Sequence, residues 1–490
     1  MKLYLDGHPF RYAMEQMMLT VFPSERPEFV DELPLDGDFA ILTLKETPKS
    51  LFGIATVCRN GKRETVTTRM KNSEEELLYK RNAQQALKLA FYRASRPFLK
   101  TPPPWGAMTG IRPAKLAARL YAEGHDDRAV DRILKDSYHV VARRRALACE
   151  VAKAGMRIKA GNRTMDASVY VGIPFCVSRC KYCSFVSHSI GQAEHLVEPY
   201  LTALFLEMEA TGKAAKELGI TVKTVYVGGG TPTALSAEQL DRVLGGIRKH
   251  FDLSDCVEFT VEAGRPDTMD AEKLSVIAKN GATRISVNPQ TMNDDVLRLI
   301  GRNHTAQDVV DMVHTVRETT NLAINMDLIA GLPGDSFPSF QNTVRQTLAL
   351  DPENITVHTL ALKKAASLWA ERLPSPSGEE VQKMVDFAAK AVQSRDFRPY
   401  YLYRQKYMSG NLENVGYAKP GQEGLYNVFI MEEIHTILSL GAGGVSKLVS
   451  PETGKLTRIF NLKYPYEYNG DHDRLIRNAD EIRAFYRENF

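Results

Sequence analysis

The sequence has few cysteines, no long apolar run and almost no excess of charge of one sign. Six cysteines among 490 residues are too few for a small secreted protein held together by disulfides. No run approaches the about 18 apolar residues of a membrane-spanning helix, and the polar start of the chain lacks the apolar stretch of a signal peptide. Lysine and arginine number 63 against 59 aspartate and glutamate, a net charge of +4. We therefore expect a cytoplasmic protein that binds neither nucleic acid nor a membrane.

What the sequence does contain is the composition of a large globular protein. Hydrophobic residues make up 43% and charged residues 25%, which is enough to bury a sizeable core. The length suggests about three domains, and the pattern changes at the polar stretch 160–163 and at the proline-rich stretch 374–378. We expect an N-terminal α+β accessory domain over 1–165, a central domain over 166–374 and a C-terminal α+β cap domain over 375–490.

The N-terminal part combines strand-like and helical patterns. Apolar runs predict strands over 2–5, 39–44 and 51–58. Helical periodicity predicts helices over 73–94, 114–123 and 128–153.

The central part alternates strands with helices. Its apolar segments predict six strands, and helical segments lie between them. Parallel neighbours need such long connections, and strands that are apolar on both faces fit a buried parallel sheet. The fold class is therefore α/β, with a six-stranded partial (β/α) barrel of parallel strands preferred and a flat, doubly wound sheet as the alternative. The predicted strands are 168–173, 222–227, 257–262, 284–287, 323–329 and 355–360.

Three of the cysteines lie close together directly after the first of these strands. Cys176, Cys180 and Cys183 have the spacing C-x3-C-x2-C. Three thiolates in a short loop can bind three irons of a [4Fe–4S] cluster and leave the fourth iron open to a small molecule. A zinc ion with His188 as a fourth ligand, or three packed thiols without a metal, are the alternatives. The spacing favours the cluster.

Polar residues and glycines stand at the ends of further strands. The stretch 228–231, Gly-Gly-Gly-Thr, follows the second strand, and Glu262, Gln290 and Asp327 lie in or after later ones. Ligands bind at the carboxyl ends of parallel strands, where glycine lets the backbone come close. A plain turn and structural caps are the alternatives, but several polar residues converging on one edge favour a binding site.

Taken together, these motifs resemble the radical S-adenosylmethionine (SAM) superfamily and, within it, the HemZ-like branch of the oxygen-independent coproporphyrinogen III oxidase family. The resemblance covers roughly residues 166–450. The motifs that carry it are at 170–183, 228–233, 260–263, 284–290, 300–305, 325–333 and 440–443.

The resemblance implies a [4Fe–4S] cluster bound by the three cysteines, with SAM on the open iron. One electron from the reduced cluster would cleave SAM into a 5′-deoxyadenosyl radical, which in the family takes hydrogen from propionate side chains. These then lose carbon dioxide and become vinyl groups. The residues implied to contact SAM are Tyr170, Tyr182, Gly229, Gly230, Thr231, Glu262, Gln290, Arg302, Asp327 and Ala361.

The expected activity is that of a coproporphyrinogen dehydrogenase, an oxidoreductase of porphyrin and haem biosynthesis that converts coproporphyrinogen III to protoporphyrinogen IX. A reduced flavodoxin- or ferredoxin-type protein would donate the electrons. A haem-binding chaperone, and a radical SAM methyltransferase or haem-opening enzyme on the same scaffold, are the alternatives. The candidates for binding the carboxylates of a tetrapyrrole substrate are Lys363, Lys364, Arg404 and Lys406, with solvated surface charge as the other interpretation.

The sequence departs from the family pattern at three places. The oxidase proper has a cysteine where this chain has Phe185, and a histidine where it has Gly172. The related haem-trafficking branch carries a His-Asn…Tyr-Trp motif. The corresponding stretch 426–431 here lacks the histidine and the tryptophan. These differences bear on the substrate more than on the cofactors.

Overall fold

A computed structural model describes residues 1–363, 365–371 and 373–490, so Lys364, one candidate for binding substrate carboxylates, lies outside the described residues. The chain forms two compact units, Met1–Glu150 with Gly410–Leu412, and Val151–Ser409 with Glu413–Phe490. The division into three domains stays a prediction. No helix in the described ranges is long and apolar enough to cross a membrane.

The first unit contains a five-stranded sheet in the order β2-β1-β3-β4-β5. Helix α2 packs on β4 at Gly53, where a Cβ atom would lie 2.5 Å from the carbonyl carbon of Ala86. The three predicted strands are confirmed as β1, β3 and β4. The elements are β1 (Lys2–Asp6), α1 (Arg11–Val21), β2 (Glu28–Val30), β3 (Phe39–Thr47), β4 (Ser50–Arg59), β5 (Lys62–Lys71) and α2 (Glu76–Ser95).

The helix predicted over 128–153 is wrong, because the chain breaks it into α4 (Asp127–Asp136) and α5 (Ala142–Ala160). His139 has a φ of 56°, a left-handed conformation that cannot continue a right-handed helix. The neighbouring amide of Val140 donates to the carbonyl oxygen of Leu134 at 3.1 Å and closes the end of α4. The helix predicted over 114–123 is confirmed as α3 (Pro113–Ala122).

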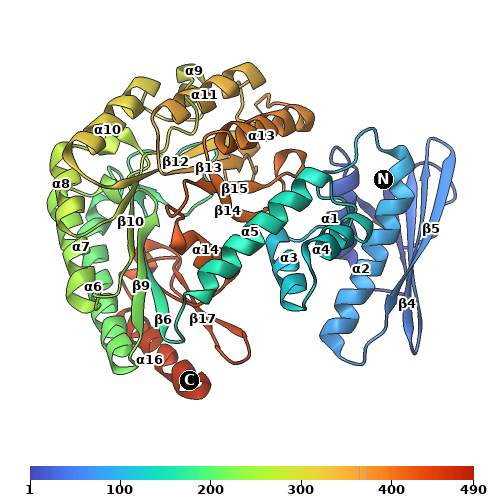
Figure 1. Ribbon diagram of the computed structural model, residues 1–490, viewed down its shortest axis with the longest axis horizontal. Coiled ribbons are helices and arrows are strands. Elements are labelled where there is room, and N and C mark those ends of the chain that lie inside the picture. Colours follow the sequence, from blue (N-terminus) through green and yellow to red (C-terminus); the bar gives the residue numbers. More distant parts are fainter. Residues whose placement is uncertain (364, 372) are drawn as a thin grey trace. The chain divides into compact units, whose positions relative to one another are not determined.

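The second unit is built on an eleven-stranded sheet in the order β14-β15-β13-β12-β11-β10-β9-β6-β16-β17-β18 (Figure 1). Strands β6 to β13 of this series are parallel and follow one another in chain order. A doubly wound sheet would reverse its strand order partway, so the partial barrel is confirmed. All six predicted strands are present, as β6 (Asp166–Ile173), β9 (Thr221–Gly229), β10 (Glu258–Glu262), β11 (Arg284–Ser286), β12 (Ala323–Ala330) and β13 (Asn354–Thr359).

Helices connect these strands and cover the outside of the barrel (Figure 1). Helix α7 begins with a capping box, in which the Ser236 hydroxyl accepts from the Gln239 amide at 3.1 Å and the Gln239 side chain accepts from the Ser236 amide at 3.1 Å. The helices are α6 (Glu194–Glu217), α7 (Ala237–His250), α8 (Ala271–Lys279), α9 (Asp294–Leu299), α10 (Ala306–Thr319) and α11 (Phe337–Ala349). The short helix α12 (Ser367–Glu371) follows the last barrel strand, and its Leu368 amide donates to the oxygen of Lys181 at 3.1 Å.

The C-terminal segment extends the sheet at both ends. Strand β15 pairs antiparallel with β13, whereas β16 pairs parallel with β6. Its elements are α13 (Gly378–Gln393), β14 (Arg398–Tyr403), β15 (Asn414–Ala418), α14 (Leu425–Glu432), β16 (Thr436–Leu440), β17 (Val445–Val449), β18 (Leu456–Phe460), α15 (Pro465–Tyr468) and α16 (His472–Asn489).

A buried carboxylate in α6 ties the barrel to this segment. Glu207 accepts hydrogen bonds from the Gly441 amide at 2.8 Å, the Tyr468 hydroxyl at 2.6 Å and the Asn461 side-chain amide at 2.6 Å. Burial raises the pKa of Glu207 above its usual range, and these donors act in the opposite direction. Three elements of the C-terminal segment therefore depend on one side chain.

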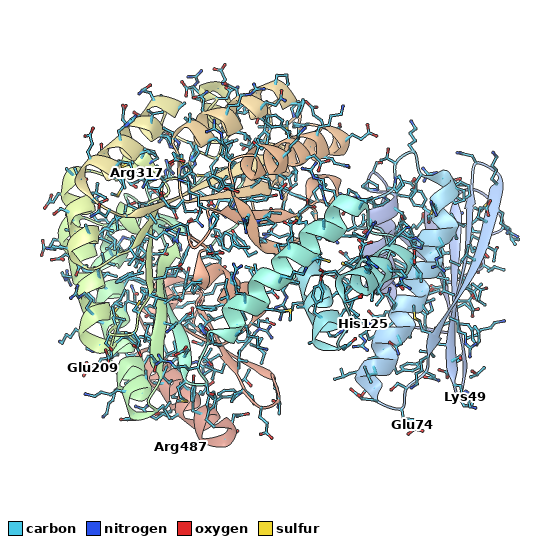
Figure 2. All side chains as sticks on the ribbon, viewed as in Figure 1. Lys49, Glu74, His125, Glu209, Arg317 and Arg487 are labelled. Atoms are coloured by element: carbon cyan, nitrogen blue, oxygen red, sulfur yellow. The ribbon has the colours of Figure 1, made fainter. Side chains whose placement is uncertain are left out.

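Replacing this carboxylate should destabilise the fold. We expect Glu207→Ala to lower the free energy of unfolding by about 1–3 kcal/mol, because its three donors lose a buried partner. Glu209→Ala, at an exposed position of the same helix (Figure 2), should change it by no more than about 0.5 kcal/mol. Urea denaturation of both variants provides the measurement, and equal effects would contradict the role of Glu207.

Candidate functional site

The site is organised by the close pairing of β6 with β9. Ile173 lies opposite Gly229 in the parallel register. The amides of the next residues continue the contact, from Gly230 to the oxygen of Ile173 and from Thr231 to the oxygen of Phe175, both at 2.7 Å. Gly229 has a φ of 103°, and a Cβ atom on Gly230 would lie 2.5 Å from the oxygen of Phe175. Glycine is required here because the cysteine loop and the glycine loop start side by side.

The cysteine loop is held by backbone contacts at its start and in its middle. It starts in β7 (Phe175–Cys176), which pairs with the short strand β8 (His188–Ser189). Further along, the Lys181 amide donates to the oxygen of Ile300 at 2.9 Å. These contacts fix the loop against two other parts of the barrel edge.

The three cysteines of this loop are free thiols and partly buried. Burial raises the pKa of Cys183, and the nearby Cys180 and Cys176 raise it further. Such an effect requires the three sulfurs to be near one another. The loop therefore gathers the three ligands that the sequence predicted.

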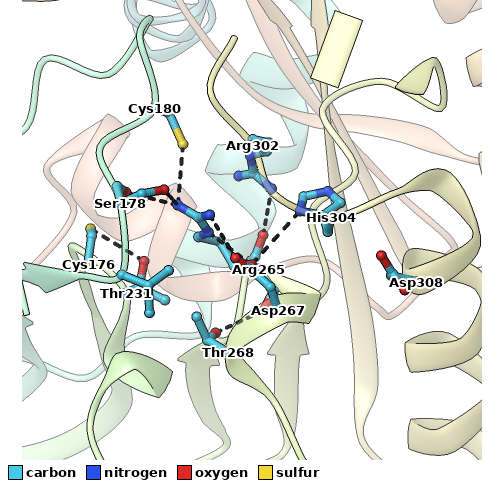
Figure 3. Close-up of polar contacts among 12 residues, drawn as sticks. Cys176, Ser178, Cys180, Thr231, Arg265, Asp267, Thr268, Arg302, His304 and Asp308 are labelled. Atoms are coloured by element: carbon cyan, nitrogen blue, oxygen red, sulfur yellow. Dashed lines mark hydrogen bonds and ion pairs between the residues drawn. The ribbon is translucent and has the colours of Figure 1, made fainter. Parts of the chain in front are cut away.

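Two of the sulfurs accept hydrogen bonds from buried side chains (Figure 3). The Thr231 hydroxyl donates to Sγ of Cys176 at 3.4 Å, and Nη1 of Arg265 donates to Sγ of Cys180 at 3.9 Å. Donors of this kind stabilise sulfur in its negatively charged thiolate form.

Arg302 lies on the same side of the loop and hydrogen-bonds the side chains of Tyr182 and Cys180. Its Nη1 also donates to the carbonyl oxygens of Gly264 at 3.0 Å and Asn288 at 2.8 Å. Burial alone would lower the pKa of Arg302, but Tyr182 and Cys180 outweigh it and raise that pKa. Burial raises the pKa of Tyr182 as well, so a cation and a neutral phenol stand beside the sulfur.

Two carboxylates of the barrel, Glu262 at the end of β10 and Asp327 within β12, differ in charge. Burial, with Asp327 adding to it, raises the pKa of Glu262 to about 7, although the Tyr226 hydroxyl donates to Oε1 at 2.5 Å. Burial would also raise the pKa of Asp327, but His358 and Asn325 outweigh it and hold that pKa below its usual value. Nε2 of His358 lies 3.7 Å from Oδ2, and Nδ2 of Asn325 donates to Oδ1 at 3.0 Å. Asp327 is therefore charged at neutral pH, whereas Glu262 is poised between its two forms.

Three tyrosines pack together beside these carboxylates. The ring of Tyr170 stacks on those of Tyr226 and Tyr426 at centroid distances of 6.2 Å, and the latter two rings stack at 4.5 Å. The hydroxyl of Tyr170 would lie 3.3 Å from a Cβ atom placed on Gly229. The three rings thus form one stacked aromatic group that joins β6, β9 and α14.

The contacts described for two further predicted residues, Gln290 and Ala361, are made by their backbone. Gln290 has a φ of 64°, and its amide donates to the oxygen of Asp327 at 2.9 Å, while its own oxygen accepts from Ile329 at 2.9 Å. Ala361, just after β13, forms a bridge with Met408. The SAM contacts of all ten predicted residues stay predictions.

The structure thus brings most of the predicted residues into two adjoining groups. Cys176, Cys180 and Cys183 form one with Tyr182, Thr231 and Arg302, and the other contains Tyr170, Gly229, Glu262 and Asp327. The sequence analysis missed side chains that complete both groups. Tyr226 and His358 lie near the ends of predicted strands and Arg265 follows one by three residues, which was the available signal, whereas no local pattern marks Tyr426. The missed residues are Tyr226, Arg265, His358 and Tyr426.

Residues 170–347 match the Radical SAM superfamily. The HemZ protein of Bacillus subtilis (strain 168), described as oxygen-independent coproporphyrinogen-III oxidase-like, is 40% identical over 370 residues, covering 74% of this chain and 74% of that protein. The chain belongs to the radical SAM superfamily and to its HemN/HemZ-like family.

Two further likenesses agree with this family. The heme chaperone HemW of Bacillus subtilis (strain 168) is 33% identical over 266 residues, 53% of this chain and 66% of that protein. The solved structure of the Escherichia coli coproporphyrinogen III oxidase HemN, a radical SAM enzyme, superposes with a TM-score of 0.52 at 22% identity, covering 66% of this chain and 72% of that one. The second likeness supports the fold of the barrel.

As a member of this family, the protein uses a [4Fe–4S] cluster and SAM. Within the described residues, no three Cys, His, Asp or Glu side chains are grouped closely enough to bind one metal ion together. A [4Fe–4S] cluster requires its cysteine sulfurs to be further apart than the ligands of one metal ion, since each thiolate binds a different iron. Three free thiols with hydrogen-bond donors at two of their sulfurs fit that group, and Cys176, Cys180 and Cys183 would hold it.

The cluster ligands can be tested by metal content. Anaerobically reconstituted protein should contain about four irons per chain, and alanine at Cys176, Cys180 or Cys183 should abolish a stable cluster. Cys58→Ala and Cys256→Ala remove cysteines outside the loop and should keep it. Iron analysis and the visible spectrum report the outcome, and stoichiometric zinc in protein made under iron-replete, anaerobic conditions would contradict it.

The pocket assignment can be tested at Asp327. If this carboxylate contacts SAM, Asp327→Ala should weaken binding by about 1–3 kcal/mol, or about 5- to 150-fold, without loss of the cluster. Asp311→Ala, at an exposed position on α10, is the matched control. Titration of SAM into the reduced protein, followed by EPR, measures both properties. Unchanged affinity together with a much lower melting temperature would identify Asp327 as a structural cap.

Proposed function

We propose that this radical SAM enzyme converts coproporphyrinogen III to protoporphyrinogen IX without oxygen, in porphyrin and haem biosynthesis. The observation that carries the proposal is the 40% identity, over 74% of both chains, to a relative described as oxygen-independent coproporphyrinogen-III oxidase-like. The carboxylates Glu262 and Asp327 and the tyrosines packed beside them support it, because they would flank the place of hydrogen abstraction.

When bound, the cluster and SAM supply the one-electron chemistry that removes a hydrogen atom. The chain's own residues orient and enclose the reactants. Asp327, which carries a negative charge, and Glu262 would hold cationic groups of SAM. The stacked tyrosines would keep water away from the reacting carbon. Each of the two propionate side chains that react would lose a hydrogen atom, carbon dioxide and one electron, which a one-electron acceptor takes up, and would become a vinyl group.

The substrate carries several carboxylates that need cationic partners. Lys363 is exposed just beyond β13, whereas Arg404 is only 7% exposed, and burial lowers its pKa to about 10. Lys363 is thus the better-placed candidate for binding a substrate carboxylate. We further propose that a reduced flavodoxin- or ferredoxin-type protein donates the electrons and that the reaction takes place in the cytoplasm.

A second candidate function is that of a haem-binding chaperone. The 33% identity to a heme chaperone HemW favours it, but the His-Asn…Tyr-Trp motif of that branch is absent from residues 426–431. Phe185, where the oxidase proper has a cysteine, is 67% exposed, and nothing in the structure explains the replacement.

The deciding experiment is anaerobic incubation of the reconstituted protein with reductant, SAM and coproporphyrinogen III. We expect protoporphyrinogen, carbon dioxide and 5′-deoxyadenosine, with one 5′-deoxyadenosine for each vinyl group formed. Cys180→Ala, which should lack the cluster, is the control without turnover.

Other outcomes would overturn the proposal. Tight binding of haem without any decarboxylation would favour the chaperone. Cleavage of SAM with transfer of its methyl group, or with opening of a haem ring, would favour the other enzymes of this scaffold.

A further inference from the structure

The sulfur of Cys180 lies between two buried guanidinium groups. Nη1 of Arg265 is 3.9 Å from it, and Arg302 hydrogen-bonds the same side chain. Arg265 is 3% exposed and Arg302 is 6% exposed. Because burial of a cation is costly unless it has a partner, two such groups at one sulfur need an explanation.

The position of Arg265 is fixed by its other contacts (Figure 3). Asp267 holds the guanidinium by two of its nitrogens, from Nε to Oδ1 at 3.1 Å and from Nη2 to Oδ2 at 2.9 Å. The remaining nitrogen, Nη1, donates to the carbonyl oxygen and the hydroxyl of Ser178, both at 2.9 Å. Since Ser178 lies between two of the cluster ligands, Arg265 is aimed at the cysteine loop.

The other ionisable groups near Arg265 and Arg302 do not cancel the positive charge that these two side chains present to the sulfur. His304 lies with Nδ1 4.0 Å from Oδ1 of Asp267. Burial, followed by the charge of Arg302, lowers the pKa of His304 to about 4, so its ring is neutral near pH 7. Asp267 therefore binds the edge of Arg265 that points away from Cys180, whereas Arg265 and Arg302 both present hydrogen-bond donors to that sulfur.

We propose that Arg265 is a positioning residue that raises the reduction potential of the cluster by stabilising negative charge at the Cys180 thiolate. Reduction adds one electron to the cluster, so a nearby cation stabilises the reduced form more than the oxidised form. Hydrogen bonds to the sulfurs and local net charge are known to set such potentials. This effect requires the cluster that the family carries, but it does not depend on which substrate the enzyme converts.

Arg265 can act whether or not SAM is bound. Arg302 is one of the residues predicted to contact SAM, whereas all three side-chain nitrogens of Arg265 are already engaged by Asp267, Ser178 and Cys180. Its effect should thus be present in protein that holds the cluster alone. A donor protein could then reduce the cluster before SAM is bound.

The experiment is a redox titration of the reconstituted cluster without SAM, followed by EPR. Arg265→Gln removes the cation and should make the midpoint potential more negative. Asp267→Asn leaves the cation of Arg265 uncompensated and should make it more positive. Arg179→Gln is the matched control. Arg179 is an exposed arginine of the same loop, whose Nη2 donates to the oxygen of Ala365 at 2.9 Å, and solvent screens its charge more than that of buried Arg265.

Opposite shifts in the first two variants, both distinctly larger than the shift in Arg179→Gln, are the expected result. Shifts of the same sign, or no larger than that of the control, would overturn the proposal. If Arg265→Gln does not hold a full cluster, Asp267→Asn decides alone, and a potential at or below that of the wild type would overturn it. Failure of the substrate assay would leave this result unaffected.

Discussion

The parallel pairing of β6 with β9 is the contact on which the site depends. Two hydrogen bonds of 2.7 Å continue this pairing beyond the strands and set the glycine loop against the start of the cysteine loop. Only glycine fits at residue 230, where a Cβ atom would collide with the carbonyl oxygen of Phe175. The sulfur ligands, the Thr231 hydroxyl and the end of β10 consequently meet at one edge of the sheet. This edge is where parallel barrels place their ligands.

Burial of charge is the second constraint on this edge. Each buried ion described here has a partner that offsets the cost of removing it from water. Asp327 is held by His358 and Asn325, and Arg265 is held by Asp267. Glu262 has a weaker set of partners, and its raised pKa shows that burial prevails there. A cationic ligand would complete that balance, which is the physical reason to place SAM beside this carboxylate.

The sequence was sufficient for the barrel and for the cluster loop because both leave local patterns. Buried parallel strands are short apolar runs, and the cysteines lie within eight residues of one another. The break at His139 left no such pattern, since a left-handed residue interrupts a helix without changing its apolar periodicity. Strand β5 was also missed, because most of its residues are polar and exposed.

The partners that complete the site could not be read from local patterns. Tyr426 comes from helix α14, far along the chain, yet its ring stacks on Tyr226 in β9. Arg265 follows the strand that ends in Glu262, but its proposed role depends on its contact with the sulfur of Cys180, which lies in another loop. Such pairings exist only after the sheet has formed. Composition and spacing therefore predicted the three cysteines and not the side chains that hydrogen-bond them.

The central claim is that one edge of the barrel holds both the cluster and SAM. An anaerobic crystal structure of the reconstituted protein with SAM bound would test it most directly. The account predicts the cluster on Cys176, Cys180 and Cys183, with SAM on its open iron and in contact with Glu262 and Asp327. SAM bound elsewhere, or a cofactor that leaves both carboxylates without a contact, would contradict the account.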